Sequence, residues 1–365
     1  MNNYKVKNYV NSIDLYFRPA LKGMVRYGNN YLQICKQLGA LTGQDWTPGP
    51  EGDLTVLREA MGVLQHHDAV SGTAKQHVTF DYAERLAKGF SECDEVVSYG
   101  FKNLLPKSQN QQNSVPKAQF CHLLNITQCE VTETSAAFVV NVYNPLAKPV
   151  DKFIRLPVQN QGLQVQDSQG QVLVSQVVPI PKAVLLIPGR SSKAGHELVF
   201  KAEQVPALGF KSFYISKGKS VTLQGFKLDP NARRKKTILG FKDQTKMVFS
   251  NKEGLMTGVI TDGKVKALKH TFGYYEGHPG NNSQFKFRAS GAYIFRPLGQ
   301  EPKMMENRPN VTVFKGPVSI EVHQEFSSYI TMVSRLYLGT VDVEHEWLVG
   351  PIPVSDGIGK EVISR

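Results

Sequence analysis

The sequence has no long apolar run and none of the commonest nucleotide-binding or serine-hydrolase motifs. No apolar stretch in the 365-residue chain approaches the roughly 18 residues that a membrane-spanning helix needs. The chain lacks the Gly-x-Ser-x-Gly turn, the Gly-x-x-x-x-Gly-Lys-Ser/Thr phosphate loop and the Gly-x-Gly-x-x-Gly dinucleotide fingerprint. Its four cysteines do not have zinc-ribbon spacing. We therefore expect no membrane span, no enzyme of those motif classes and no cysteine-bound zinc.

The chain is basic, with 43 Lys and Arg against 31 Asp and Glu and a net charge of +12. This charge is spread along the chain without a basic helix or an aromatic-plus-basic sheet motif, so no nucleic-acid partner is expected. The one dense run is Arg233-Arg-Lys-Lys236, which follows the turn-forming Asp229-Pro-Asn231. We interpret this run first as part of a solvated loop and, as the alternative, as a site for a processing protease.

The first part of the chain, residues 17–105, has the apolar period of helices. We expect helices at about 19–41, 53–70 and 73–105, with Pro19 in a first turn and Gly43 at a helix end. Three packed helices are the simplest interpretation. The polar segment 106–116 is predicted to be a linker, and residues 1–16 have no assignable pattern.

From residue 117 to 365 the apolar period becomes two. Segments 137–143, 171–178, 212–216, 257–261 and 341–347 are predicted strands. Many short strands without helices between them predict antiparallel packing, so the expected class is α+β multidomain: a three-helix bundle followed by an antiparallel β-sandwich. In the last of these strands His345 alternates with apolar residues, which indicates a hydrogen-bonded core or edge histidine rather than a ligand.

The most informative segment is centred on His66-His67-Asp68. On a helical wheel that begins at Leu54, Asp68 continues the apolar face, His67 lies at its edge and His66 points away. A buried carboxylate beside a buried imidazole is costly unless it is hydrogen-bonded, paired or bound to a metal or polar ligand. Two interpretations stay open on these residues alone: a binding site, or a pair that satisfies backbone groups where the helix stops at Gly72.

Further distinctive segments occur along the chain: Arg18-Pro-Ala-Leu-Lys22, Tyr143-Asn-Pro-Leu146, Pro206-Ala-Leu-Gly-Phe210, Ser290-Gly-Ala-Tyr-Ile-Phe-Arg-Pro297 and Val349-Gly-Pro-Ile-Pro353. Together with the stretch from Glu59 to Tyr82, they resemble the family 38 glycoside hydrolases, the α-mannosidases, in the order of that family. The segments are most similar to its lysosomal (acid) branch. The resemblance covers about residues 17–365 and leaves residues 1–16 unmatched.

The resemblance implies roles for three residues. His67 matches the family's zinc-binding histidine, and Asp68 matches the carboxylate that hydrogen-bonds hydroxyls of the bound mannose. Tyr293 matches a tyrosine that reaches into the same sugar site from the β-domain. Zn²⁺ is therefore the implied metal, with one ligand from this chain. The implied reaction is retaining hydrolysis of terminal α-D-mannose residues of N-glycan oligosaccharides.

In that family the other zinc ligands, the nucleophile and the acid/base lie on an N-terminal barrel, which we expect to be absent here. No second His-x-Asp pair occurs outside His66-His67-Asp68, and one imidazole cannot complete a zinc site. The chain is therefore expected to be a truncated piece, inactive alone, whose partners are the missing barrel and the remaining C-terminal β-structure. The alternative is a non-catalytic carbohydrate-binding or assembly module that binds mannose weakly through Asp68 and Tyr293.

An interrupted sheet at the C-terminus would expose an unpaired edge, so we also expect poor solubility or dependence on a partner polypeptide. No apolar leader follows Met1, which agrees with an expected N-terminal truncation.

The four cysteines allow three connectivities. Cys35 and Cys93 each lie in a predicted helix, and Cys121 and Cys129 would close a small loop around Asn125. The resemblance fits the pairs Cys35–Cys93 and Cys121–Cys129, and reduced buried thiols are the alternative.

Three glycosylation sequons agree with a secretory-pathway history, and the resemblance implies the lysosome. These sequons are at Asn125, Asn281 and Asn310.

Overall fold

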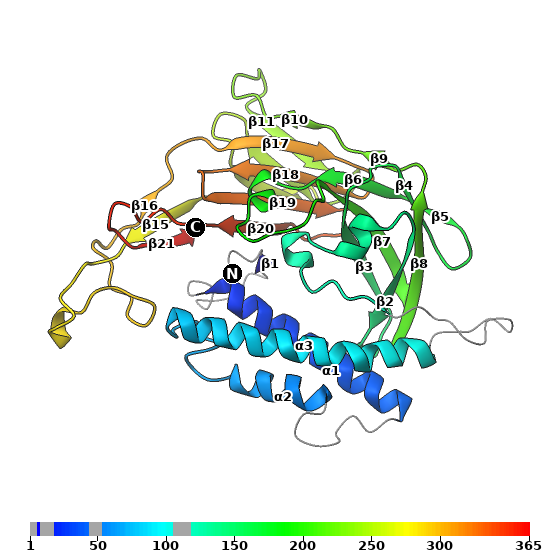
Figure 1. Cartoon of the computed structure of the whole chain (residues 1–365). Coiled ribbons are helices and arrows are strands. Elements are labelled where there is room, and N and C mark those ends of the chain that lie inside the picture. The colour runs from blue at the N-terminus through cyan, green and yellow to red at the C-terminus, as the bar shows by residue number, and fades with distance from the viewer. Residues whose placement is uncertain (1–5, 8–17, 44–52, 105–117) are drawn as a thin grey trace.

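The computed structural model describes residues 6–7, 18–43, 53–104 and 118–365. Three long helices, α1 (Pro19–Thr42), α2 (Asp53–Val63) and α3 (Gln76–Leu104), pack along one side of the molecule below a set of β-sheets (Figure 1). Helix α1 begins at Pro19, where a missing N–H costs nothing. It ends at Gly43, which has a left-handed φ of 66° and donates its N–H to the carbonyl of Ala40. The predicted linker 106–116 and all of residues 1–16 except β1 lie outside the described residues.

The helices share one apolar core. The side chains of Leu38, Leu57 and Leu86, one from each helix, are fully buried, and the disulfide Cys35–Cys93 joins α1 to α3 within the same cluster. Glycine permits the closest approach, because a Cβ placed on Gly89 would lie 2.8 Å from the Cα of Leu57 on α2. The packing of α2 against α3 therefore depends on the absence of a side chain at position 89.

The predicted extent of the second helix, residues 53–70, is wrong at its end. Helix α2 stops at Val63, and the chain continues to residue 74 as a series of turns. Short polar side chains compete there with helical hydrogen bonds: the Ser71 hydroxyl bonds to the carbonyl of His67, and the Thr73 hydroxyl donates to Asp68. A helical wheel therefore does not predict the side-chain directions of residues beyond 63.

Two sheets form a first sandwich over a common core. One contains β2 (Phe138–Asn144), β8 (Gly209–Lys217), β4 (Leu163–Gln166) and β5 (Val172–Leu173), in that order. The other contains β3 (Val150–Val158), β7 (His196–Val205), β6 (Ser175–Pro179) and β9 (Val221–Thr222), of which β6 and β9 are parallel. Helices α4 (Glu130–Thr134) and α5 (Lys182–Leu185) and a 3₁₀ turn at Leu124–Ile126 are short additions.

Three further sheets complete the described β-structure. A six-stranded sheet has the order β1 (Val6–Lys7), β20 (Glu344–Val349), β19 (Ile330–Tyr337), β18 (Ser319–Glu325), β17 (Asn310–Lys315) and β10 (Gly225–Lys227). It shares a core with the sheet of β11 (Lys236–Gly240), β12 (Lys246–Ser250), β13 (Met256–Thr261) and β14 (Lys264–Ala267). The last sheet contains β16 (Lys303–Met304), β15 (Phe272–Glu276) and β21 (Lys360–Ser364).

The predicted α+β class is confirmed, because helices and antiparallel sheets occupy separate regions. Each predicted strand segment overlaps an observed strand, although β20 starts only at Glu344 and leaves Val341 outside it with its side chain 69% exposed. None of the helices in the described ranges is long and apolar enough to cross a membrane.

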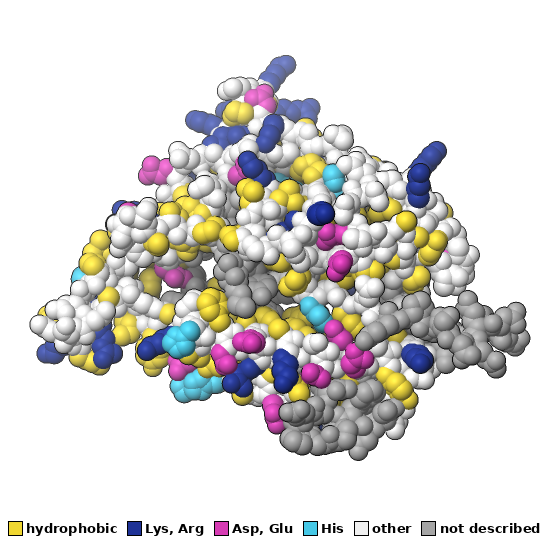
Figure 2. Space-filling view, in the orientation of Figure 1, with side chains coloured by type: hydrophobic (Ala, Val, Ile, Leu, Met, Phe, Trp, Pro, Cys, Tyr) yellow, Lys and Arg dark blue, Asp and Glu magenta, His cyan; other side chains and the backbone are white. Residues whose placement is uncertain are grey.

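Basic side chains are scattered over the surface in Figure 2, with a denser group at the end of the molecule where β10 and β11 lie. The run 233–236 is exposed there, between these two strands. Its first interpretation, a solvated loop, agrees with this position.

A buried ion network connects the first sandwich to the six-stranded sheet. Arg155 on β3 bonds to Glu197 on β7 at 2.6 Å and to Glu321 on β18 at 2.7 Å. Arg335 on β19, which is fully buried, bonds to Glu321 and to Glu346 on β20. Burial by itself would raise the pKa of Glu321, but Arg155 and Arg335 outweigh it and hold the pKa well below its usual value.

Two histidines meet where β15 packs against β20. The rings of His270 and His345 lie edge to face with centroids 4.8 Å apart. His345 bonds through Nδ1 to the hydroxyl of Ser334 at 3.0 Å, which agrees with the predicted hydrogen-bonded core or edge histidine. Burial lowers the pKa of His345 to about 4, with His270 contributing, and burial also lowers the pKa of His270.

This pair predicts a loss of stability on acidification. Because the folded-state pKa of His345 lies below its unfolded value of 6.5, the unfolded chain binds the proton first. The resulting loss in the free energy of unfolding is absent above pH 6.5 and grows as the pH falls toward 4. We expect the His345→Gln variant to lose about 3 kcal/mol less stability than the parent between pH 7.5 and pH 4. Chemical unfolding at both pH values measures this difference, with the exposed His77→Gln as control; equal losses in His345→Gln and parent would contradict it.

Candidate functional site

The turn that follows α2 brings together the three residues of the central motif. Asp68 Oδ2 lies 3.4 Å from Nε2 of His66 and 3.7 Å from Nε2 of His67. The other carboxylate oxygen, Oδ1, accepts a 2.8 Å hydrogen bond from the hydroxyl of Thr73. This bond lowers the pKa of Asp68, and the two histidines lower it further. The carboxylate is therefore held ionised beside two imidazole nitrogens.

The donor set of this turn fits a metal ion. His66, His67 and Asp68 each offer one ligand atom, and these atoms lie within 4.8 Å of one another. Donors bound to one tetrahedral zinc lie about 3.4 Å apart, so small side-chain rotations would bring these atoms into range. Within the described ranges these residues are the one group of three or more His, Cys, Asp and Glu side chains with such spacing. They could supply up to three ligands, whereas the sequence predicted only His67.

The predicted orientation of this motif is wrong for His67. The side chain of His67 was expected to point inward, but it is 84% exposed. His66 was expected to point away from the apolar face, and its side chain is 45% exposed, although its Nε2 is the closer of the two imidazole nitrogens to Asp68. The reason is the end of α2 at Val63, after which the turns place successive side chains on one side of the backbone. Asp68, with 30% of its side chain exposed, is partly covered as predicted.

Tyr293 lies in the long connection between β15 and β16, which extends from the sheets beside the helices (Figure 1). Its side chain is 73% exposed. Its neighbours Gly291 and Ala292 line a cavity of about 450 Å³, and Gly72, four residues after Asp68, lines the same cavity. The structure thus brings the segments of Asp68 and Tyr293 to the walls of one cavity, although neither side chain lines it.

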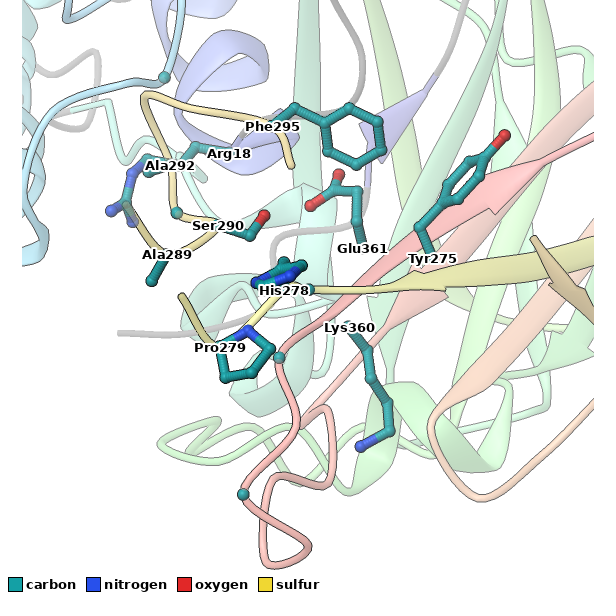
Figure 3. A pocket seen from close by; sticks show the side chains of 15 residues that line it. Arg18, Tyr275, His278, Pro279, Ala289, Ser290, Ala292, Phe295, Lys360 and Glu361 are labelled. Carbon is teal, nitrogen blue, oxygen red and sulfur yellow. The ribbon is translucent and has the colours of Figure 1, made fainter. Parts of the chain in front are cut away.

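The cavity contains residues that the sequence did not single out as functional. Arg18 precedes α1, has a left-handed φ of 50° and donates to the carbonyl of Ala74, which fastens α1 to the segment after the turn. His278 follows β15, and Glu361 belongs to β21 (Figure 3). No local pattern marks these positions, because they become neighbours only when distant segments pack together.

The predicted disulfides are present, and the predicted glycosylation sites differ in their exposure to solvent. The structure contains the disulfides Cys35–Cys93 and Cys121–Cys129. Asn281 and Asn310 are exposed, whereas Asn125 is half-buried with its amide oxygen shielded from solvent. A glycan fits most easily at the two exposed positions.

Three family models match the chain in order. The alpha mannosidase middle domain matches residues 17–104, the lysosomal alpha-mannosidase-like central domain matches 174–215, and the glycosyl hydrolases family 38 C-terminal domain matches 242–365. The helical bundle and the β-sandwiches thus match the middle and C-terminal domain models of one family, in the order of that family. The chain belongs to glycosyl hydrolase family 38.

Individual relatives agree with this assignment. Lysosomal alpha-mannosidases of Felis catus and Homo sapiens are each 39% identical over 95% of the chain, and the alpha-mannosidase of Canavalia ensiformis is 39% identical over 85%. The chain spans about 33% of the length of each of these relatives. A solved alpha-mannosidase from Enterococcus faecalis has the same fold over 92% of the chain and 41% of its own, with a TM-score of 0.51 and 13% identity.

Proposed function

We propose that this chain is the metal- and sugar-binding side of a zinc-dependent, retaining α-mannosidase that acts on mannose-containing oligosaccharides. The observation that carries the proposal is the cluster of His66, His67 and Asp68 on a turn that borders the same cavity as the Tyr293 segment. Two disulfides, the exposed sequon asparagines and the lysosomal relatives support a place in the lysosome or the secretory pathway.

The residues of this chain bind and orient rather than react. His67 would hold the zinc ion, with His66 near enough to assist, and the metal would supply Lewis-acid contact with sugar hydroxyls. Asp68 would accept hydrogen bonds from hydroxyls of the mannose, since Thr73 occupies only one of its oxygens. Tyr293 would donate from the β-domain. The nucleophile and the acid/base, two carboxyl groups in retaining enzymes, would come from a barrel beyond these residues.

The proposal predicts binding without turnover. We expect zinc titration of the pure chain to shift the ring resonances of His67 and His66 and to leave those of His77, on α3, in place. We expect Asp68→Asn to weaken binding of methyl α-D-mannoside about tenfold or more, because a charged hydrogen-bond acceptor is lost. Asp81→Asn, an exposed site paired with Arg85, is the matched control. Unchanged mannoside binding in Asp68→Asn would refute the role of this carboxylate.

The same proposal predicts that the pure chain does not hydrolyse an aryl α-mannoside. Measurable turnover, abolished by His67→Ala, would show that the chain contains its own reactive carboxyl groups and would overturn that part. Mannoside binding that is independent of zinc, His67 and Asp68 would instead favour a non-catalytic carbohydrate-binding or assembly module.

A further inference from the structure

The cavity of about 450 Å³ extends from the metal-type turn into the β-domain. Gly72 and Arg18 form its helical wall, the connection after β15 forms a second wall, and β21 with the loop before it forms a third (Figure 3). Its volume lies within the range of about 300–1,000 Å³ that is typical of small-molecule sites. The His66-His67-Asp68 cluster borders this space without lining it, so the cavity is a separate compartment next to the proposed mannose site.

The carboxyl group of Glu361 lies in this compartment without a hydrogen-bond or ion-pair partner among the described side chains. The side chain of Glu361 points toward Ser290 and Phe295 across the cavity (Figure 3). Within the described ranges no side chain bonds to it. The two cations of the lining are engaged elsewhere: Arg18 donates to Ala74 and Gln76, and Lys360 bonds to Asp356 at 2.6 Å. Burial raises the pKa of Glu361 to about 7.

An aromatic wall stands opposite this carboxyl group. Phe295 is 47% exposed, and its ring meets that of Tyr275 edge to face with centroids 5.4 Å apart. An unpaired carboxyl group invites hydroxyl donors, because leaving it without partners in a partly buried site is unfavourable. An exposed aromatic face favours the apolar face of a sugar ring. The two features together match a hydroxylated ring better than they match an anion or a purely apolar ligand.

We propose that this cavity binds a second hexose unit of the oligosaccharide, with Glu361 accepting hydrogen bonds from its hydroxyls and Phe295 packing against its ring. The inference rests on the proposed function, because the first unit would occupy the Asp68 side of Gly72. Glu361 then helps to choose among oligosaccharides without touching the bond that is cleaved.

The test compares a monosaccharide with disaccharides. Dissociation constants are measured at pH 8, where Glu361 is mostly ionised, for methyl α-D-mannoside and for the α-1,2-, α-1,3- and α-1,6-linked mannobioses. In the parent we expect at least one mannobiose to bind about tenfold tighter than the monosaccharide. This advantage is expected to vanish in Glu361→Gln and Phe295→Ala and to survive in the matched control Glu203→Gln, an exposed glutamate on β7. Monosaccharide binding is expected to be the same in all four proteins.

The outcomes separate the two proposals. A mannobiose advantage that is missing in the parent, or unchanged in both cavity variants, overturns the second site and leaves the mannose site standing. An advantage that depends on Glu361 while Asp68→Asn binds mannoside normally supports the cavity and overturns the proposed mannose site. Absence of binding by every sugar overturns both.

Discussion

Replacing Arg335 with methionine is expected to lower the free energy of unfolding by about 3–5 kcal/mol, the usual cost of removing one partner from a buried ion pair. Glu321 would keep Arg155 but lose its second cation, and Glu346 would lose the guanidinium that faces it. The free-energy penalty for keeping these carboxylates out of water would remain, because a methionine side chain fills the space but supplies no hydrogen-bond donor to them. The loss is therefore larger than a change in packing alone would produce.

Denaturant unfolding followed by the β-sheet signal measures this loss. The matched control is Lys201→Met on β7, which removes a cation from an exposed pair with Asp151 and Glu203; its expected cost is below about 1 kcal/mol. Because the pKa of Glu321 is depressed in the folded state, its contribution is present above the ordinary value of 4.5 and is lost only as the pH falls further. The deficit of Arg335→Met is thus expected at both pH 7 and pH 5, and a loss equal to that of Lys201→Met would contradict it.

Replacing Gly89 with leucine is expected to destabilise the helical bundle by about 3 kcal/mol, as overpacking of a filled core does. Helix propensity alone predicts the opposite sign, since leucine is better than glycine in a helix by nearly 1 kcal/mol. The packing wins because even a Cβ at this position would meet the Cα and side chain of Leu57 at 2.8–3.1 Å. Helix α2 would have to move away from α3, and the turn with His66 and Asp68 would move with it.

Gly23→Ala provides the matched control for this prediction. Gly23 also lies within a long helix, α1, but a Cβ there would meet nothing within 4 Å. We expect Gly23→Ala to stabilise the chain by about 0.5–1 kcal/mol through helix propensity. If Gly89→Leu proves as stable as the parent, the close contact between α2 and α3 is not present in solution.

Much of the fold could be predicted because its signals are local. Pro19 and Gly43 marked the limits of α1, since each residue has a backbone preference that needs no neighbours. The period-two segments marked strands for a similar reason. The end of α2 could not be predicted, because Leu64 and His67 continue the helical pattern of the preceding residues in the sequence. The hydrogen bond between Thr73 and Asp68 and the bond from Ser71 to a backbone carbonyl favour a turn instead.

The candidate site divides in the same way. The resemblance to the family identified His67, Asp68 and Tyr293 as candidates, and the residue pattern alone drew attention only to the His66-His67-Asp68 segment. The addition of His66 to the metal-type cluster came from the turn geometry. Glu361 and His278 could not be identified from the sequence as cavity residues, because the residues around them are those of an ordinary strand or loop.

The sequence by itself determined the helical and β halves of this chain, its family and the candidate residues of the proposed metal and sugar site. Only the tertiary structure decided which way the histidines face, that Glu321 is shared by two arginines from different sheets, and that β21 places a lone carboxyl group beside the metal-type turn. Backbone preferences and residue chemistry act within a few positions of the chain. Contacts between residues hundreds of positions apart depend on how whole elements pack, and that packing minimises the free energy of the entire molecule rather than of any one segment.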